Sequence, residues 1–62
     1  MRKRIFLLGL VIKEIDPVSG TGQIKIGTEV WSAKSEDESV IEENSKVEVV
    51  KIDGVKAVVK KI

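Results

Sequence analysis

Residues Gly20 to Ala33 read Gly-Thr-Gly-Gln-Ile-Lys-Ile-Gly-Thr-Glu-Val-Trp-Ser-Ala, and this stretch predicts a complete β-hairpin. A type II′ hairpin turn requires glycine at its first central position, which places the two-residue turn at Gly27-Thr28. Because side chains alternate along a strand, the hairpin then has one apolar and one polar face. The register pairs Ile26 with Glu29, Ile24 with Trp31 and Gly22 with Ala33. The apolar face comprises Ile24, Ile26, Trp31 and Ala33, and the polar face Gln23, Lys25, Ser32 and Lys34.

Three further strands are predicted around this hairpin, over Leu8–Ile15, Lys46–Ile52 and Val55–Lys60. The first is apolar on both faces at its start, which is typical of a strand that takes part in two sheet regions of a closed barrel or whose end is covered. Gly20 and Gly22 indicate a bulge or a barrel corner at the start of the second strand.

The dipeptide Asp53-Gly54 predicts a type I′ turn between the last two strands. Strict pairing about this turn gives the two strands apolar residues on both faces. One face contains Ile52, Val50, Val55, Ala57 and Val59, and the opposite face contains Val47, Val49 and Val58. Because both faces are rich in valine, we expect a bulge near Val49-Val50. Five short strands with tight turns favour an all-β fold, a small barrel rather than a sandwich.

Composition limits the chemistry that this chain can perform. Its 62 residues suffice for one domain with a stability of only about a few kcal/mol. It has no cysteine and no histidine, which excludes disulfides and the commonest zinc ligands. The formal net charge is +1, whereas a small nucleic-acid binder usually carries a clear basic excess.

The first residues form a basic and then apolar leader. Arg2-Lys3-Arg4 followed by Ile5 to Ile12 resembles the start of a signal peptide, but the apolar run ends at Lys13-Glu14 and no small-residue cleavage site follows. It is also too short for a membrane span, which needs about 20 apolar residues. We interpret residues 1–7 as a leader, or as the cytoplasmic flank of a membrane helix outside this chain, and residues 8–62 as the barrel domain.

The connection from Ser35 to Ser45 is acidic, with Val40 and Ile41 as its only apolar residues. A calcium loop needs a central glycine and ligands at alternate positions, and neither is present. We predict a solvated loop, with or without a short helical turn, that tucks Val40 and Ile41 onto the barrel end. No metal or cofactor is expected.

A set of residues in a particular order and spacing runs through most of the chain: Gly9, Ile15-Asp16-Pro17, Gly20, Gln23 to Gly27, Glu29, Trp31-Ser32-Ala33, Ser35, Val47 to Val50, Asp53-Gly54, Ala57 and Val59. In this set the chain resembles the C-terminal soluble domain of the NfeD family, a five-stranded OB-fold barrel. One departure is Asn44-Ser45, where the family often has glycine; asparagine also tolerates left-handed geometry.

The resemblance implies a non-catalytic protein-interaction module that acts with stomatin- or prohibitin-like membrane proteins. In the family this barrel is tethered to transmembrane helices, which these residues do not contain. Longer members carry a domain resembling serine proteases, with no counterpart here. The expected location is therefore cytoplasmic or membrane-associated, with any membrane contact made through a tether or a partner outside this chain.

Trp31 and the serines bear on two other functions, nucleic-acid binding and catalysis. An OB-fold that binds single-stranded nucleic acid stacks bases on exposed aromatics, but the hairpin register places Trp31 on the apolar face, in the core. A serine nucleophile needs a positioned base, and without histidine only a Ser-Lys pair remains. Glu29 beside Trp31 is interpreted as a surface carboxylate rather than a raised-pKa acid. Nucleic-acid binding stays the alternative, and no catalytic residue is predicted.

The residues predicted to contact a partner are Val30, Lys25, Lys34, Val58 and Lys56. Val30 is the sole apolar residue on the polar face of the hairpin, and Val58 lies between Lys56 and Lys60. Together with Val18 or Ile62, these valines would form a small contact patch. An edge strand that pairs with an extended partner segment is the other possibility.

Overall fold

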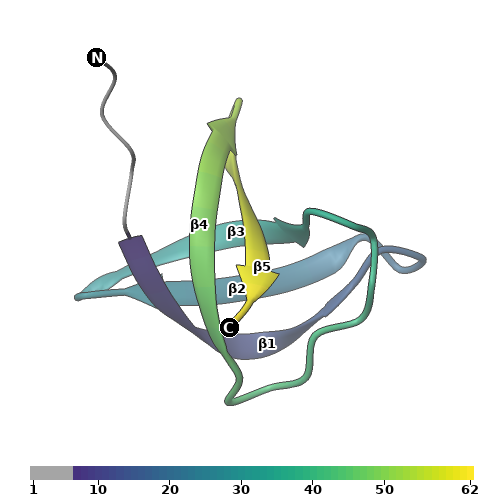
Figure 1. The fold of residues 1–62 in the computed structure, drawn as a ribbon, viewed down its shortest axis with the longest axis horizontal. Coiled ribbons are helices and arrows are strands. Elements are labelled where there is room, and N and C mark those ends of the chain that lie inside the picture. Colours follow the sequence, from purple (N-terminus) through teal and green to yellow (C-terminus); the bar gives the residue numbers. More distant parts are fainter. Residues whose placement is uncertain (1–6) are drawn as a thin grey trace.

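The computed structural model describes residues 7–62, which form five strands joined into one barrel (Figure 1). The strands are β1 (Leu7–Asp16), β2 (Thr21–Ile26), β3 (Glu29–Ser35), β4 (Lys46–Asp53) and β5 (Lys56–Lys61). They are ordered β1-β2-β3-β5-β4, and β4 pairs back onto β1 to close the barrel. Only the pairing of β3 with β5 is parallel. This architecture confirms the predicted all-β, OB-fold-like barrel of five strands.

The hairpin of β2 and β3 has the predicted register. Ile24 lies opposite Trp31, and Ile26 lies opposite Glu29. Gly27 has φ +60°, while the only non-glycine residues with positive φ among residues 7–62 are Glu38 and Asn44. The turn therefore has a left-handed residue at its first central position only, as a type II′ turn requires.

Two bulges bend β1, and both are in β1 rather than in β2. Val11 pairs with Ile24 and Lys13 with Gln23, so β1 gains one residue; it gains another before Asp16 pairs with Thr21. An extra residue bends a strand and increases its twist. The bend lets β1 pair with β4 at its start and with β2 along the rest of its length, as Figure 1 shows.

Gly22 lies opposite the second bulge. A Cβ at this position would lie 2.7 Å from the carbonyl oxygen of Ala33 and 2.9 Å from Cγ1 of Ile15. The glycine thus permits a close approach of three strands, which confirms that it marks a barrel corner. Gly20 precedes β2 in the turn, where its N–H donates to the carbonyl of Asp16 at 2.8 Å.

The turn between β4 and β5 differs from the prediction by one residue. Asp53 pairs with Lys56, so the turn is Gly54-Val55 and not Asp53-Gly54. A type I′ turn would require positive φ at Asp53 as well, whereas here only Gly54, with φ +65°, is left-handed. Val55 thus lies in the turn and not on a strand, and its side chain is accordingly 82% exposed. The predicted bulge is confirmed at Val50, between the pairs of Val49 with Val59 and Lys51 with Val58.

The core is aliphatic and draws on every strand. Its members are Val11, Ile15, Ile24, Ala33, Ile41, Val47, Val49, Ala57 and Val59. Ile26 and Trp31 are partly buried and pack against this cluster.

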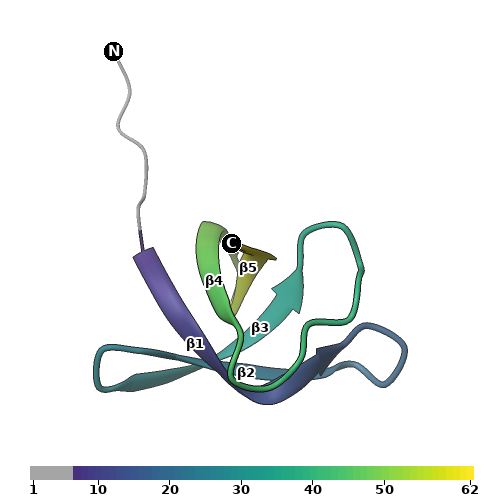
Figure 2. The ribbon, with the colours of Figure 1, turned by 60° about the horizontal axis from the view of Figure 1, so that its bottom comes forward.

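The acidic connection between β3 and β4 closes one end of the barrel (Figures 1 and 2). Ile41 forms an isolated bridge to Ile15 and is 2% exposed, as predicted. The prediction for Val40 is wrong, because its side chain is 54% exposed: neighbouring side chains of extended backbone point to opposite sides. Asn44 has φ +72°, which confirms the left-handed geometry expected there. Residues 36–45 contain no helix.

β1 begins at Leu7, one residue before the predicted strand. The rest of the predicted leader, residues 1–6, lies outside the described part of the chain.

Candidate functional site

The five residues predicted to contact a partner fall into two groups on the outside of the barrel. Lys25 and Val30 pair directly with each other across β2 and β3, and Val30 is 55% exposed. The second group comes from β3 and β5, where Lys34 pairs with Val58 and Ser32 with Lys56. Paired residues share a face of a sheet, and Val30, Ser32 and Lys34 alternate along one face of β3, so the two groups adjoin each other on that strand.

Val58 is 4% exposed, so the prediction that it forms part of an exposed patch is wrong. Its cross-strand partners are Lys34 on β3 and Lys51 on β4. Side chains directly opposite each other are close enough for the lysine stems to cover the smaller valine. Val18 and Ile62 stay exposed, at 95% and 69%, but with Val58 buried they complete no patch around it.

A cleft of about 620 Å³ runs past the second group. The turn between β1 and β2, the ends of β3 and β4 and the start of β5 form its walls. Its basic lining residues are Lys34, Lys51 and Lys56, and its acidic lining residues are Asp16, Glu36, Glu38 and Asp53. Carboxylates slightly outnumber ammonium groups, so the cleft offers no concentrated positive field.

One of these charges is already paired. Lys34 Nζ donates to Asp53 Oδ2 at 3.0 Å, with both side chains about half exposed. This hydrogen bond, together with the positive charges of Lys34 and Lys51, lowers the pKa of Asp53 below its ordinary value of 3.8. Lys34 is therefore partly neutralised, unlike the free ammonium groups that phosphate recognition uses.

Trp31 lies at the edge of the core and not wholly within it. It packs against the buried cluster while remaining partly exposed, and its indole N–H donates to Glu29 Oε1 at 3.2 Å. The prediction of a core position is thus confirmed in part. Glu29 is exposed, as expected of a surface carboxylate.

Three of the five serines that a Ser-Lys mechanism could use bond to carboxylates instead. Ser19 Oγ donates to Asp16 at 3.2 Å, and Ser35 and Ser39 Oγ donate to Asp37 Oδ1 at 2.8 and 2.7 Å. These bonds lower the pKa of Asp37, Ser39 contributing most and Ser35 next. Within residues 7–62 no serine hydroxyl bonds to a lysine, and no cluster of acidic side chains has the form of a metal site.

Sequence reasoning missed the outer face of β1. Leu8 and Leu10 are 63% and 39% exposed, and Leu10 pairs with Lys25 on one side and Lys46 on the other. The signal was present in the doubly apolar start of the strand, which we attributed to a second sheet region or a cover. The structure leaves that face open within the described residues.

The chain is similar in sequence to known proteins over most of its length. Residues 6–61 match the family model described as the NfeD-like C-terminal, partner-binding domain. In sequence, the chain is 39% identical over 56 residues to an uncharacterised protein of Methanocaldococcus jannaschii and 40% identical over 55 residues to a membrane-bound protease of Pyrococcus horikoshii. These alignments cover 90% and 89% of this chain, which spans 38% and 12% of the lengths of the two relatives.

Two solved structures share the barrel. The C-terminal domain of a stomatin operon partner protein from Pyrococcus horikoshii superposes with a TM-score of 0.80 at 32% identity, covering 100% of this chain and 97% of that one. The soluble domain of a membrane protein implicated in regulation of membrane protease activity, from Corynebacterium glutamicum, superposes with a TM-score of 0.81 at 27% identity, covering 94% and 92%. Residues 7–62 of the present chain include no helix long and apolar enough to cross a membrane.

Proposed function

The chain belongs to the NfeD family, as its C-terminal, partner-binding domain, and from this premise we propose that it is a non-catalytic module that binds a stomatin- or prohibitin-like protein. The observation that carries the proposal is the match of almost the whole barrel to a domain defined by partner binding. A relative with the same fold is a stomatin operon partner protein, which supports this class of partner.

The proposed place of action is the membrane surface, reached through a tether or through the partner. Two relatives support this: a membrane-bound protease and a membrane protein whose soluble domain has this fold. The barrel itself supplies a rigid scaffold, because its strands pair in a closed ring and its core is fully aliphatic. Recognition then depends on side chains of the outer surface, where Lys25 and Val30 are exposed.

The test is direct binding to the soluble domain of a stomatin-like protein from the same organism. Isothermal titration calorimetry with the 62-residue chain is expected to show saturable binding, and size-exclusion chromatography with light scattering to show a complex of higher mass. Absence of binding in both measurements would contradict the proposed partner class.

Nucleic-acid binding is the alternative that the same experiment must address. A single-stranded oligonucleotide in place of the protein partner is expected to give no binding, because carboxylates outnumber lysines in the cleft and the partly buried Trp31 packs against the core and donates its N–H to Glu29. Binding of the oligonucleotide that weakens steeply with added salt would favour the alternative instead.

A further inference from the structure

One row of exposed side chains runs across the outside of four neighbouring strands. Lys46 on β4 pairs with Leu10 on β1, Leu10 pairs with Lys25 on β2, and Lys25 pairs with Val30 on β3. Ile62 continues the row beyond Lys46, because its N–H donates to the carbonyl of Lys46 at 3.2 Å. We call these five residues the Leu10 row: Ile62, Lys46, Leu10, Lys25 and Val30.

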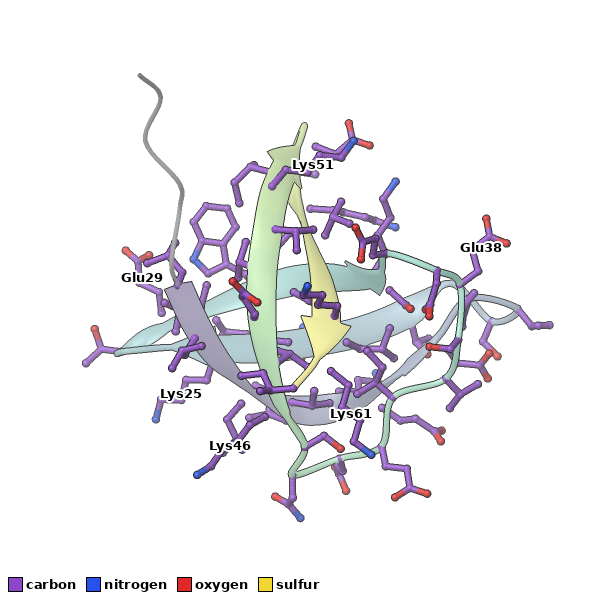
Figure 3. All side chains as sticks on the ribbon, viewed as in Figure 1. Lys25, Glu29, Glu38, Lys46, Lys51 and Lys61 are labelled. Carbon is purple, nitrogen blue, oxygen red and sulfur yellow. The ribbon has the colours of Figure 1, made fainter. Side chains whose placement is uncertain are left out.

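The Leu10 row alternates apolar and basic side chains, and none of them is buried. Its apolar members are 69%, 39% and 55% exposed for Ile62, Leu10 and Val30. Both lysines are exposed and form no salt bridge with another residue of the described chain. Figure 3 shows Lys25 and Lys46 extending from the same side of the barrel. A partner that covers such a surface gains free energy by burying the exposed apolar side chains and by pairing its own charges with the lysines.

The cleft on β3 and β5 is the weaker candidate surface. Val58 and Ala33, which line it, are each only 4% exposed and have little apolar area left to bury. Lys34 is already bonded to Asp53. A partner would therefore gain less from apolar burial and from charge pairing in the cleft than on the Leu10 row.

The spacing of the row matches one face of an α-helix. Adjacent strands lie about 4.8 Å apart, so Lys46, Leu10 and Lys25 are separated by steps of about that length. A helix rises about 5.3 Å between side chains three to four residues apart. A helix that crosses β1 can thus place an acidic residue over each lysine and an apolar residue over Leu10, at i, i+4 and i+7.

We propose that the Leu10 row docks an acidic amphipathic helix of a protein partner, with carboxylates on Lys25 and Lys46 and an apolar anchor on Leu10. This inference rests on the proposed function and locates its binding surface. An anionic lipid surface fits less well, because Glu48 lies in the adjacent row between Leu8 and Lys60 and the whole chain carries a formal charge of only +1. In this proposal the group of Lys25 and Val30 contacts the partner, and the group of Lys34 and Lys56 on the side of the cleft does not.

The test uses amide spectra of the ¹⁵N-labelled chain. The chain is titrated in turn with four ligands. Two are protein-like: a stomatin-like soluble domain and a helical peptide bearing Glu, Leu and Glu at i, i+4 and i+7. The other two are the same peptide with Lys in place of Glu, and vesicles containing phosphatidylglycerol. The variant Lys25→Glu/Lys46→Glu removes the basic members of the row. Lys51→Glu/Lys56→Glu changes the net charge equally, but on the side of the cleft, and Figure 3 places Lys51 far from Lys25 and Lys46.

The acidic peptide and the stomatin-like domain are expected to shift the signals of Leu8, Leu10, Lys25, Val30 and Lys46, and the basic peptide to shift none of them. Lys25→Glu/Lys46→Glu should weaken both interactions at least about tenfold at low salt, while Lys51→Glu/Lys56→Glu binds like the wild type. Leu10→Ser provides a variant without charge change and should also weaken both.

Three results would overturn the inference: shifts confined to the cleft, equal losses in the two charge variants, or shifts of the same row by vesicles alone. If the wild type binds the stomatin-like domain and the row variants bind it equally well, the docking surface is wrong and the proposed function stands. If the wild type fails to bind that domain, the proposed partner class is wrong, and the acidic peptide still decides whether the row accepts a helix.

Discussion

Ile15 and Ile41 exchange two backbone hydrogen bonds, from the N–H of Ile15 to the carbonyl of Ile41 at 2.9 Å and from the N–H of Ile41 to that of Ile15 at 3.0 Å. Their side chains are 1% and 2% exposed. This bridge attaches the middle of the acidic segment to the end of β1, while hydrogen bonds of Glu36 with Val59 and of Asn44 with Val11 hold its two ends. The segment thereby acts as a plug for the barrel without forming any helix of its own.

We expect Ile41→Ala to lower the free energy of unfolding by about 3 kcal/mol, because it removes buried methylene groups and leaves a cavity. Ile41→Val should cost only about 1 kcal/mol and keep the chain folded for comparison. Val40→Ala is the matched control, since Val40 is 54% exposed. Urea denaturation monitored by Trp31 fluorescence measures all three, and an equal effect of the Val40 and Ile41 substitutions would contradict the plug.

Gly22 makes a second prediction about how the barrel closes. Gly22→Ala should destabilise the chain more than Gly20→Ala, although both residues have positive φ. An added Cβ at Gly22 would overlap Ala33 O and Ile15, whereas Gly20 has nothing within 4 Å and should cost about 1–2 kcal/mol for its left-handed backbone alone. Denaturation midpoints of the two variants provide the test, and equal midpoints would show that β1 can shift away from β2 without loss.

Much of the fold was predictable because local turn chemistry and side-chain alternation agreed. At Gly27-Thr28 the turn and the apolar face both predicted the pairing of Ile24 with Trp31, which the structure contains. Between β4 and β5 they gave less guidance. Valines occupy both faces there, so side-chain alternation was compatible with the Asp53-Gly54 turn as well. It could not distinguish that turn from the observed Gly54-Val55 turn, one residue further along.

The register of β4 and β5 can be tested at Val55 and Val59. In the structure Val55 is 82% exposed and Val59 is fully buried, although the sequence prediction placed both in one apolar face. Val55→Ala should change the free energy of unfolding by less than about 0.5 kcal/mol, as for an ordinary surface position. Val59→Ala should cost about 2 kcal/mol. Similar costs for the two substitutions would support the Asp53-Gly54 turn instead.

The partner surface was less predictable than the fold. Lys25 and Val30 were found because they share the polar face of one hairpin, a relationship that local sequence contains. Leu10 and Lys46 join them only through pairings of β1 with both β2 and β4, which link residues far apart in the chain. Val58 was misplaced for the same reason: its cover comes from lysines on two other strands.

Asp37 gives the last prediction, which concerns pH. Its carboxylate accepts hydrogen bonds from the hydroxyls of Ser35 and Ser39 and from the N–H of Ser39, at 2.8, 2.7 and 3.2 Å, and these lower its pKa below 3.8. A lowered pKa in the folded state means that ionised Asp37 stabilises the fold above about pH 4 and that this contribution disappears as the pH falls through the folded-state pKa.

Asp37→Asn should therefore be less stable than the wild type at pH 7, and the difference should narrow as the pH is lowered below 4, where Asp37 is itself becoming neutral. Urea denaturation of both proteins at each pH gives this difference directly. Glu36→Gln is the matched control, because it removes an adjacent exposed charge that accepts no side-chain hydrogen bond in the described structure. A difference for Asp37→Asn that is constant with pH would mean that the serine bonds hold the loop equally well with a neutral acceptor.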